Sequence, residues 1–249
     1  MKKSIFKTVL PLLAVALLGV FFATSCEKEK KENNDGLFLK KEITINYGLK
    51  GVQNYKYNQG LLESIVNELT IEGSTISSTL TITYDMASRP VKAWYDSGGH
   101  FLFEYQNGLL HTLTYIIEPN DTIIFTVTGY DNNNLITDIT TTQLYNTSIT
   151  SLTKTHYVWE NGDIVKEISD TYNCNNGSIT HSDTTYYTYD NHPNVYSHTL
   201  FTSGSVCGVM NSKHNRIDND HSYFYDRDGR LVKTIGNTTH DTVYYQYIN

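Results

Sequence analysis

A hairpin-like unit recurs along this 249-residue chain and restricts it to one kind of fold. In each copy an aromatic residue precedes a short polar turn, and an apolar run of β-type residues follows. The clearest copy spans residues 225–235, with the sequence YDRDGRLVKTI. The copies begin at Tyr57, Tyr84, Tyr105, Tyr130, Trp159, Tyr189 and Tyr225. A period of this size is typical of one supersecondary unit, which here consists of two strands and their turns.

The turns and the flanking runs both favour antiparallel hairpins. Asn-Gly pairs at 107–108 and 161–162 supply the positive φ angles that tight hairpin turns need. Phe101, Phe103 and Tyr105 alternate with more polar positions. Period-two alternation with many Thr, Ile, Val and Tyr residues predicts strands that are half-buried on one face. The length after residue 42 accommodates about 16 strands.

One segment departs from this alternation. A helical spacing links Leu61, Leu62, Ile65, Val66 and Leu69, so a helix is a fair alternative for this segment. We predict a strand, because the segment occupies the same place in the repeat as six strand-like runs.

The first 25 residues predict a signal peptide rather than part of the fold. Lys2, Lys3 and Lys7 precede an apolar run over residues 9–22, which is too short to span a bilayer comfortably. The run leads to the sequence ATSC at 23–26, which resembles the lipobox of bacterial lipoproteins. The resemblance implies cleavage before Cys26 and lipid attachment there, with palmitate among the acyl chains. An ordinary secretory peptide is the alternative.

Residues 26–42 are charged and turn-rich, which predicts a flexible tether between the lipid and a β-repeat domain over residues 43–249. We therefore expect an outer-membrane, lipid-anchored protein that faces either the cell surface or the periplasm. Removal of the signal peptide takes away three lysines and no acidic residue, which moves the formal charge from −7 to −10. This acidic balance argues against a nucleic-acid partner. Oligomeric state is left open.

Two cysteines follow the tether, Cys174 and Cys207. An oxidising compartment permits a disulfide between them, and two free thiols are the alternative. Their spacing fits no metal motif.

Residues 225–231, YDRDGRL, resemble the YD repeat of Rhs-type proteins. The whole pattern is similar to a family of bacterial lipoproteins that carry a domain of unknown function with a porin-like fold, over roughly residues 43–249. This resemblance implies an all-β fold, an antiparallel meander of repeated hairpins rolled into an open or partly closed porin-like barrel. Because many outward positions are Thr, Ser and Asn, we expect the sheet to be water-soluble and held by lipid alone. The family offers no catalytic or binding residues to transfer.

The residues that could carry chemistry have structural explanations. Twenty tyrosines and two tryptophans suit glycan stacking, but their recurrence at one repeat position favours packing across strands. The nine histidines include no closely spaced metal-binding pair. Asp218, Asp220, Asp226 and Asp228 suit calcium, yet turn aspartates usually bond to their own backbone. No catalytic motif occurs, so we expect no cofactor, no metal and no enzymatic activity.

Residues 191–220 interrupt the repeat, and a long insertion in a regular ladder is often functional. We expect any ligand site there or on the concavity it borders. The leading hypothesis is a non-catalytic binding or interaction module for a glycan, a peptide or a protein. The alternatives are a structural envelope component without a small ligand and, less favoured, a carboxylate-based hydrolase.

Overall fold

The computed structural model describes residues 38–47, 49–118, 121–195 and 212–248, which form antiparallel β-strands and no helix. The prediction of an all-β antiparallel meander is confirmed. The strands are β1 (Leu39–Asn46), β2 (Leu49–Asn58), β3 (Leu61–Ile71), β4 (Ser74–Tyr84), β5 (Pro90–Tyr95), β6 (His100–Gln106), β7 (Leu109–Glu118), β8 (Asp121–Tyr130), β9 (Ile136–Tyr145), β10 (Ser148–Glu160), β11 (Asp163–Tyr172), β12 (Ile179–Tyr186), β13 (Thr188–Pro193), β14 (His214–Ile217), β15 (His221–Tyr225), β16 (Leu231–Gly236) and β17 (Thr242–Tyr247).

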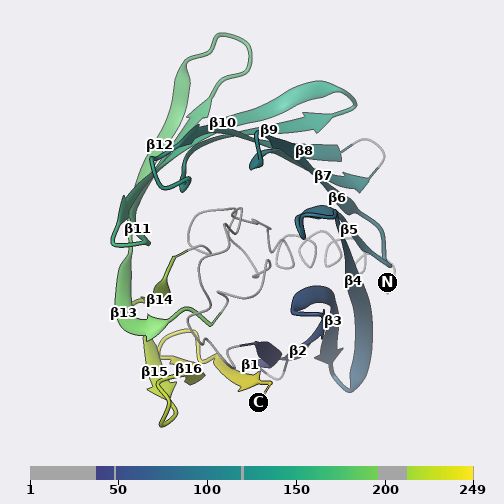
Figure 1. Cartoon of the computed structure of the whole chain (residues 1–249), viewed down its shortest axis with the longest axis vertical. Helices are drawn as coiled ribbons and strands as arrows, with labels where there is room; N and C mark the ends of the chain where they lie inside the picture. Colours follow the sequence, from purple (N-terminus) through teal and green to yellow (C-terminus); the bar gives the residue numbers. More distant parts are fainter. Residues whose placement is uncertain (1–37, 48, 119–120, 196–211, 249) are drawn as a thin grey trace.

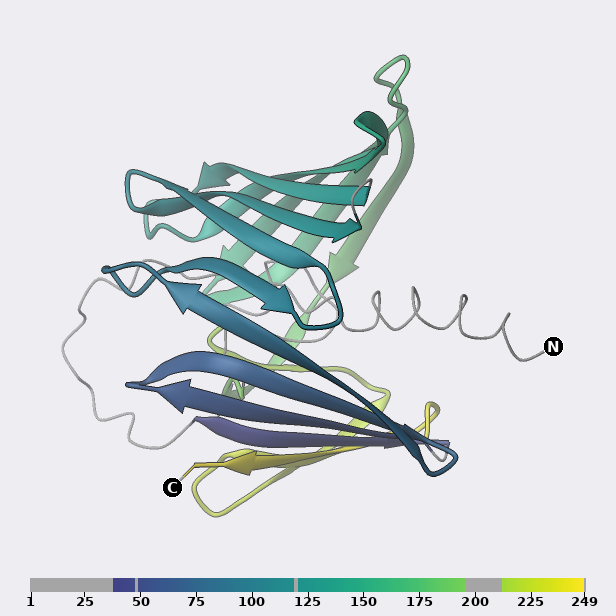
Figure 2. The ribbon, with the colours of Figure 1, turned by 90° about the vertical axis from the view of Figure 1, so that its right-hand side faces the viewer.

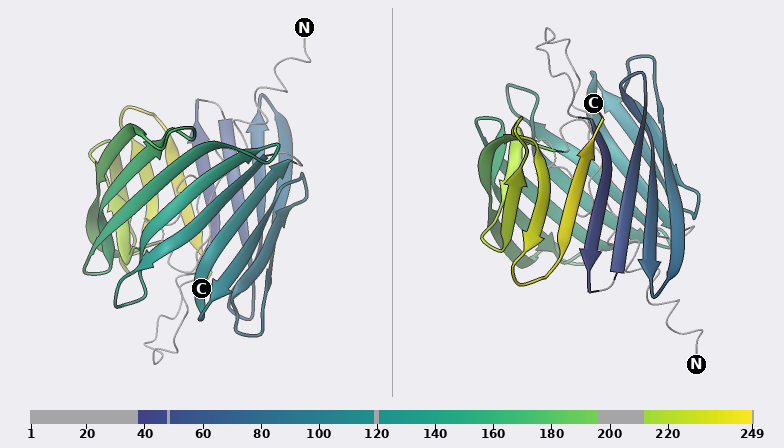
Figure 3. Two further views of the ribbon diagram at one scale, coloured as in Figure 1. Left: turned by 90° about the horizontal axis from the view of Figure 1, so that it is seen from above. Right: turned by 90° about the horizontal axis from the view of Figure 1, so that it is seen from below.

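Fifteen of these strands form one sheet, in the order β12 through β1 followed by β17, β16 and β15. The pairing of β1 with β17 brings the two ends of the described chain side by side. The sheet curves around a central axis, and its strands run obliquely to that axis (Figures 1 and 3). Backbone pairing does not close the ring, since β12 and β15 are free edges of this sheet. The small β13–β14 sheet lies between them (Figure 1).

β1 begins at Leu39, ahead of residue 43, where the domain was predicted to start. Within the described ranges, none of the elements is an apolar helix of membrane-spanning length.

The turns have the backbone conformations that their sequences predict. Asn107 and Gly108 have φ angles of 53° and 84°, and Asn161 and Gly162 have 54° and 87°, as two-residue type I′ turns require. A second class of turn begins with aspartate. Asp131 Oδ1 accepts hydrogen bonds from the backbone N–H groups of Asn133 and Leu135, both at 2.8 Å. This carboxylate stabilises its own turn.

A β-bulge explains the helical spacing within β3. Tyr57 pairs with Leu62 while Lys56 pairs with Ser64, so Glu63 is an extra residue opposite the partner strand. The extra residue places Leu62 and Ile65 on the same face of the sheet, where both are buried. The prediction of a strand is confirmed, and the three-residue spacing comes from the bulge. Register shifts also occur beside Tyr84, Tyr105, Trp159 and Tyr225.

The core consists of side chains on one face of the curved sheet. Phe101 and Phe103 of β6 are buried, while Leu102 and Glu104 between them are exposed. The cluster continues through Leu113, Phe125 and many other residues from β1 to β11. Because side chains converge on the inside of a curved sheet, we assign this face to the concave side.

Six of the seven repeated aromatic residues, and Tyr247 as well, join neighbouring hairpins through hydrogen bonds that we call aromatic clasps. The seventh, Tyr225, donates to Asp190 instead. In each clasp the polar tip of the aromatic side chain donates to the backbone carbonyl of a buried residue that is the first or second residue of an earlier strand. The pairs are Tyr57 to Leu39 (3.1 Å), Tyr84 to Leu62 (2.7 Å), Tyr105 to Pro90 (2.9 Å), Tyr130 to Leu110, Trp159 to Ile136 (2.8 Å), Tyr189 to Ile164 (2.8 Å) and Tyr247 to Leu231 (2.7 Å).

The clasps lie where neighbouring strands separate. The β3–β4 ladder ends at Ser64–Thr81, short of Leu62 and Tyr84, and the Tyr84 hydroxyl crosses the remaining gap. A buried backbone carbonyl needs a hydrogen-bond partner, and the aromatic side chain supplies one beside the bulge. The repeat position is therefore used for packing and hydrogen bonding between hairpins.

Candidate functional site

The structure describes two parts of the irregular stretch, residues 191–195 and 212–220. The second part contacts the turn between β10 and β11. The backbone N–H of Lys213 donates to the Gly162 carbonyl at 2.9 Å. The N–H of His214 donates to Asp163 Oδ1 at 2.9 Å, and His214 Nδ1 lies 2.7 Å from Asp163 Oδ2. The start of β14 is thus fastened to the start of β11 through both backbone and side chain.

Ser212 lies behind this pair and is only 2% exposed. Its hydroxyl donates to the Tyr189 hydroxyl at 2.9 Å and accepts the N–H of Ile164 at 3.2 Å. Burial is the main cause that raises the pKa of Tyr189 to about 12, so this hydroxyl stays neutral and donates to Ile164. Although serine, histidine and aspartate are gathered here, the serine is enclosed and its hydroxyl is engaged. The arrangement stabilises the junction of the two sheets.

Side chains continue this junction to β15. Asp190 Oδ2 accepts hydrogen bonds from the Tyr225 hydroxyl and from Asn215 Nδ2, the latter at 3.4 Å. The His192 ring stacks on the Tyr225 ring, with centroids 4.0 Å apart. We call this side-chain junction between β11, β13, β14 and β15 the seam. It joins the edges of the ring where the main sheet has no backbone ladder.

Next to the seam, the concave face changes from apolar to polar. Thr153 and Thr155 of β10 lie opposite Thr171 and Ser169 of β11, with hydroxyl oxygens 3.3 Å and 3.0 Å apart. These residues share a face with the buried Tyr157, and each of them is partly exposed. Together with Glu167 on the same face of β11, they form a surface that we call the polar wall.

The polar wall joins a carboxylate to an aromatic ring and a cation. Glu167 accepts the Tyr187 hydroxyl at 2.7 Å and the Ser169 hydroxyl at 3.3 Å. The Arg216 guanidinium lies 4.4 Å from the centre of the Tyr187 ring and is exposed. Such a surface offers acceptors, donors and charge of both signs to a hydroxyl-bearing ligand.

The polar wall was not predicted from the sequence, because threonine and serine were expected on the outward face. The sequence does carry a signal for it, namely the change from apolar to hydroxyl-bearing residues at every second position of the strands. Phe101 and Phe103 occupy the concave face in β6, whereas Thr153 and Thr155 occupy it in β10.

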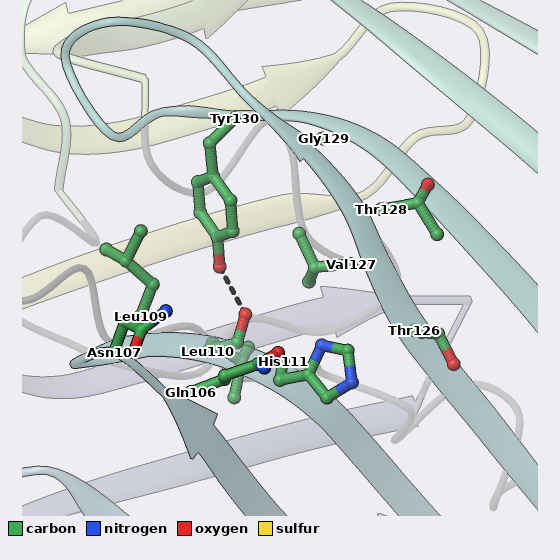
Figure 4. Close-up of a pocket in the computed structure, with 10 residues that line it drawn as sticks. All are labelled: Gln106, Asn107, Leu109, Leu110, His111, Thr126, Val127, Thr128, Gly129 and Tyr130. Carbon is green, nitrogen blue, oxygen red and sulfur yellow. Dashed lines mark hydrogen bonds between the residues drawn. The ribbon is translucent and has the colours of Figure 1, made fainter.

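A cavity of about 430 Å³ lies where β7 and β8 separate. The ladder ends at Thr112–Thr126, and beyond it the Tyr130 hydroxyl reaches the Leu110 carbonyl across the gap (Figure 4). The imidazole of His111 lies at the same opening (Figure 4). This cavity is the opening that an aromatic clasp spans.

The aspartates considered for calcium bind protein groups. Asp226 Oδ1 accepts the N–H groups of Asp228 and Arg230, both at 2.9 Å, and Oδ2 accepts Arg230 Nε at 2.7 Å. Slight burial acts to raise the pKa of Asp226, but the hydrogen bonds from Arg230 and Asp228 lower it overall. Asp218 Oδ1 lies 2.8 Å from His221 Nδ1. Within the described ranges, no group of three or more metal-binding side chains occurs.

Of the sequence-predicted site residues, Cys174 lies exposed in the turn between β11 and β12. Cys26 and Cys207 lie outside the described residues, as does most of the stretch 191–220. Lipid attachment and the disulfide therefore stay predictions.

No family model matches the chain, and no curated protein sequence is significantly similar to it. Among solved structures, a porin-like protein from Bacteroides uniformis matches with a TM-score of 0.55 and 14% identity, covering 84% of this chain and 98% of that one. A TcdB2–TccC3–Cdc42 complex matches at a TM-score of 0.28 and 11% identity, over 77% of this chain and 12% of that one, which is too low to bear on the fold. The chain thus has a porin-like fold.

Proposed function

We propose that the protein is a non-catalytic lipoprotein of the bacterial outer membrane that binds a hydroxyl-rich ligand, such as a glycan, on the polar wall. The lipobox-like sequence ending at Cys26 supports the anchor. The observation that carries the binding proposal is the partly exposed row of Thr153, Thr155, Ser169 and Thr171 beside Glu167. An inward face that serves only for packing is expected to stay apolar.

The chemistry of the polar wall matches a sugar better than an apolar ligand. Carboxylate oxygens accept bonds from pairs of sugar hydroxyls, and threonine and serine hydroxyls both donate and accept. The clasp tyrosines have their hydroxyls engaged with backbone carbonyls, so the free donors and acceptors of the polar wall carry recognition in this proposal.

Glycan-array binding followed by titration calorimetry tests this proposal. We expect Glu167→Gln to weaken binding by about tenfold, because it replaces a charged acceptor with a neutral one. The matched control is Asp170→Asn, which makes the same change on the opposite face of β11 and leaves the affinity unchanged. Equal effects of the two variants would reject the site. Turnover of a substrate by a protein that binds no glycan would reject the function.

A structural envelope component without a small ligand is the second candidate. It is supported by the aromatic clasps, which commit the repeated aromatic residues to joining hairpins. This alternative expects no array binding and no difference between the two variants.

A further inference from the structure

We propose that the ligand of the polar wall is an acidic glycan, and that Arg216 of β14 binds a carboxylate group of one of its sugars. This inference rests on the function proposed above and specifies the class of sugar. Arg216 stacks on the Tyr187 ring, and the hydroxyl of that ring donates to Glu167 of the polar wall. The guanidinium and the polar wall are therefore close enough to contact one ligand together.

The register of the small sheet places Arg216 on the concave side. β14 lies between the green and yellow ends of the curved main sheet (Figures 1 and 2). Arg216 pairs with Tyr189 across β13 and β14, so their side chains share one face. Tyr187, two residues before Tyr189, packs against the concave core. The Arg216 side chain, which lies over this ring, is exposed and accessible to a ligand.

Two other arginines show how this chain completes a guanidinium that is stacked on tyrosine. In both, the ring covers one face of the guanidinium and a turn aspartate accepts a hydrogen bond from its edge. The two sets are Arg89 with Tyr105 (4.6 Å to the ring centre) and Asp85 (2.8 Å from Nε to Oδ2), and Arg230 with Tyr247 (5.5 Å) and Asp226 (2.7 Å). Stacking leaves the edge of the planar guanidinium free to bind a carboxylate.

Arg216 has the ring but lacks the carboxylate. Its guanidinium lies 4.4 Å from the centre of the Tyr187 ring. Among the residues that the structure describes, no aspartate or glutamate forms an ion pair with Arg216. Asp163 and Asp190 of the adjoining seam bind groups of the seam instead. The edge that an aspartate occupies on the other two stacked arginines is thus left for the anion of a ligand.

The Tyr187 ring holds two groups of opposite charge. Its hydroxyl donates to Glu167 at 2.7 Å, and its face carries Arg216. A uronic acid carries a carboxylate and several hydroxyls on one ring, so it offers a partner to each group. Guanidinium binds a carboxylate through two parallel hydrogen bonds, and a carboxylate such as Glu167 accepts hydroxyls. A neutral sugar satisfies Glu167 alone, which favours the acidic class.

Matched sugars test this charge preference. A glycan array presents acidic oligosaccharides beside the same oligosaccharides with their carboxyl groups reduced to alcohols, and titration calorimetry of the full chain in mild detergent compares the best-bound pair. We expect the acidic member to bind about tenfold more tightly. Equal affinity for the two members would reject the acidic class and leave the glycan function standing. Absence of binding to any glycan would reject the proposed function itself.

Substitutions assign the preference to Arg216. Arg216→Gln should lower the affinity for the acidic member about tenfold more than the affinity for the reduced one, because it removes the charged donor. Arg216→Lys keeps the charge without the planar fork, so its effect should be smaller. Arg227→Gln is the matched control, since it removes the same charge from the exposed turn between β15 and β16. Circular dichroism checks that the variants fold, and equal losses for Arg216→Gln and Arg227→Gln would overturn the assignment.

The ratio of acidic to reduced affinity separates Arg216 from Glu167. Glu167→Gln acts on hydroxyl recognition, which both members share, so it should weaken both without lowering this ratio. Arg216→Gln should bring the ratio close to one. A ratio that falls equally in the two variants would mean that the carboxylate is not bound at Arg216.

Discussion

At the scale of single residues, the repeated aromatic position is defined by a hydrogen-bond donor at the tip of a ring. Trp159 replaces tyrosine in one copy, and its Nε1 still reaches the Ile136 carbonyl at 2.8 Å. Tyrosine and tryptophan both offer such a donor, whereas phenylalanine does not. Burial raises the pKa of Tyr57 and Tyr84, which keeps these hydroxyls neutral and able to donate.

Removing one clasp donor tests this requirement. Tyr84→Phe keeps the ring but leaves the Leu62 carbonyl without the hydroxyl, so we expect the free energy of unfolding to fall by about 1–3 kcal/mol. Urea denaturation followed by circular dichroism measures the change. Tyr145→Phe is the control, because Tyr145 is exposed at the end of β9, and it should have little effect. A loss no larger than the control's would mean that the ring alone provides the stability.

At the scale of elements, the sequence predicts the hairpins well and the bulges poorly. Turn residues such as Asn161-Gly162 have strong local preferences, so the strand ends follow from them. The bulge at Glu63 depends on how β3 pairs with β2, which local spacing does not reveal. The buried Leu62 and Ile65 therefore resemble one face of a helix when the chain is considered alone.

Two of the two-residue turns allow a pair of reciprocal substitutions at their first position. Gln59 and Asn107 occupy the same turn position, with φ angles of 51° and 53°. Asparagine adopts this left-handed conformation more readily than glutamine. We expect Gln59→Asn to raise the free energy of unfolding by about 0.5 kcal/mol, and Asn107→Gln to lower it by a similar amount. Thermal denaturation measures the stability of both variants against the wild-type protein. Changes of the same sign in the two variants would contradict the explanation.

At the scale of the whole molecule, the ring is completed by side chains whose partners are far apart in sequence. Asp163 and His214 are separated by 51 positions, and Asp190 and Tyr225 by 35. No local pattern predicts such pairs, so the sequence indicated only where the repeat fails. For the polar wall, alternation marks the inward residues of β10, but the bulge in β11 decides which residues of that strand lie opposite them, and local spacing does not reveal it.

If the seam holds the ring together, weakening it should loosen one side of the molecule alone. Tyr225→Phe removes the hydrogen bond to Asp190 but retains the ring that stacks on His192. Local opening has its own free energy, distinct from global unfolding. We expect amide hydrogen exchange to accelerate about tenfold in β13 and β15 while β7 to β9 keep their protection. Tyr145→Phe again serves as the control. Uniform acceleration across all strands would instead indicate that the seam and the main sheet open as one cooperative unit.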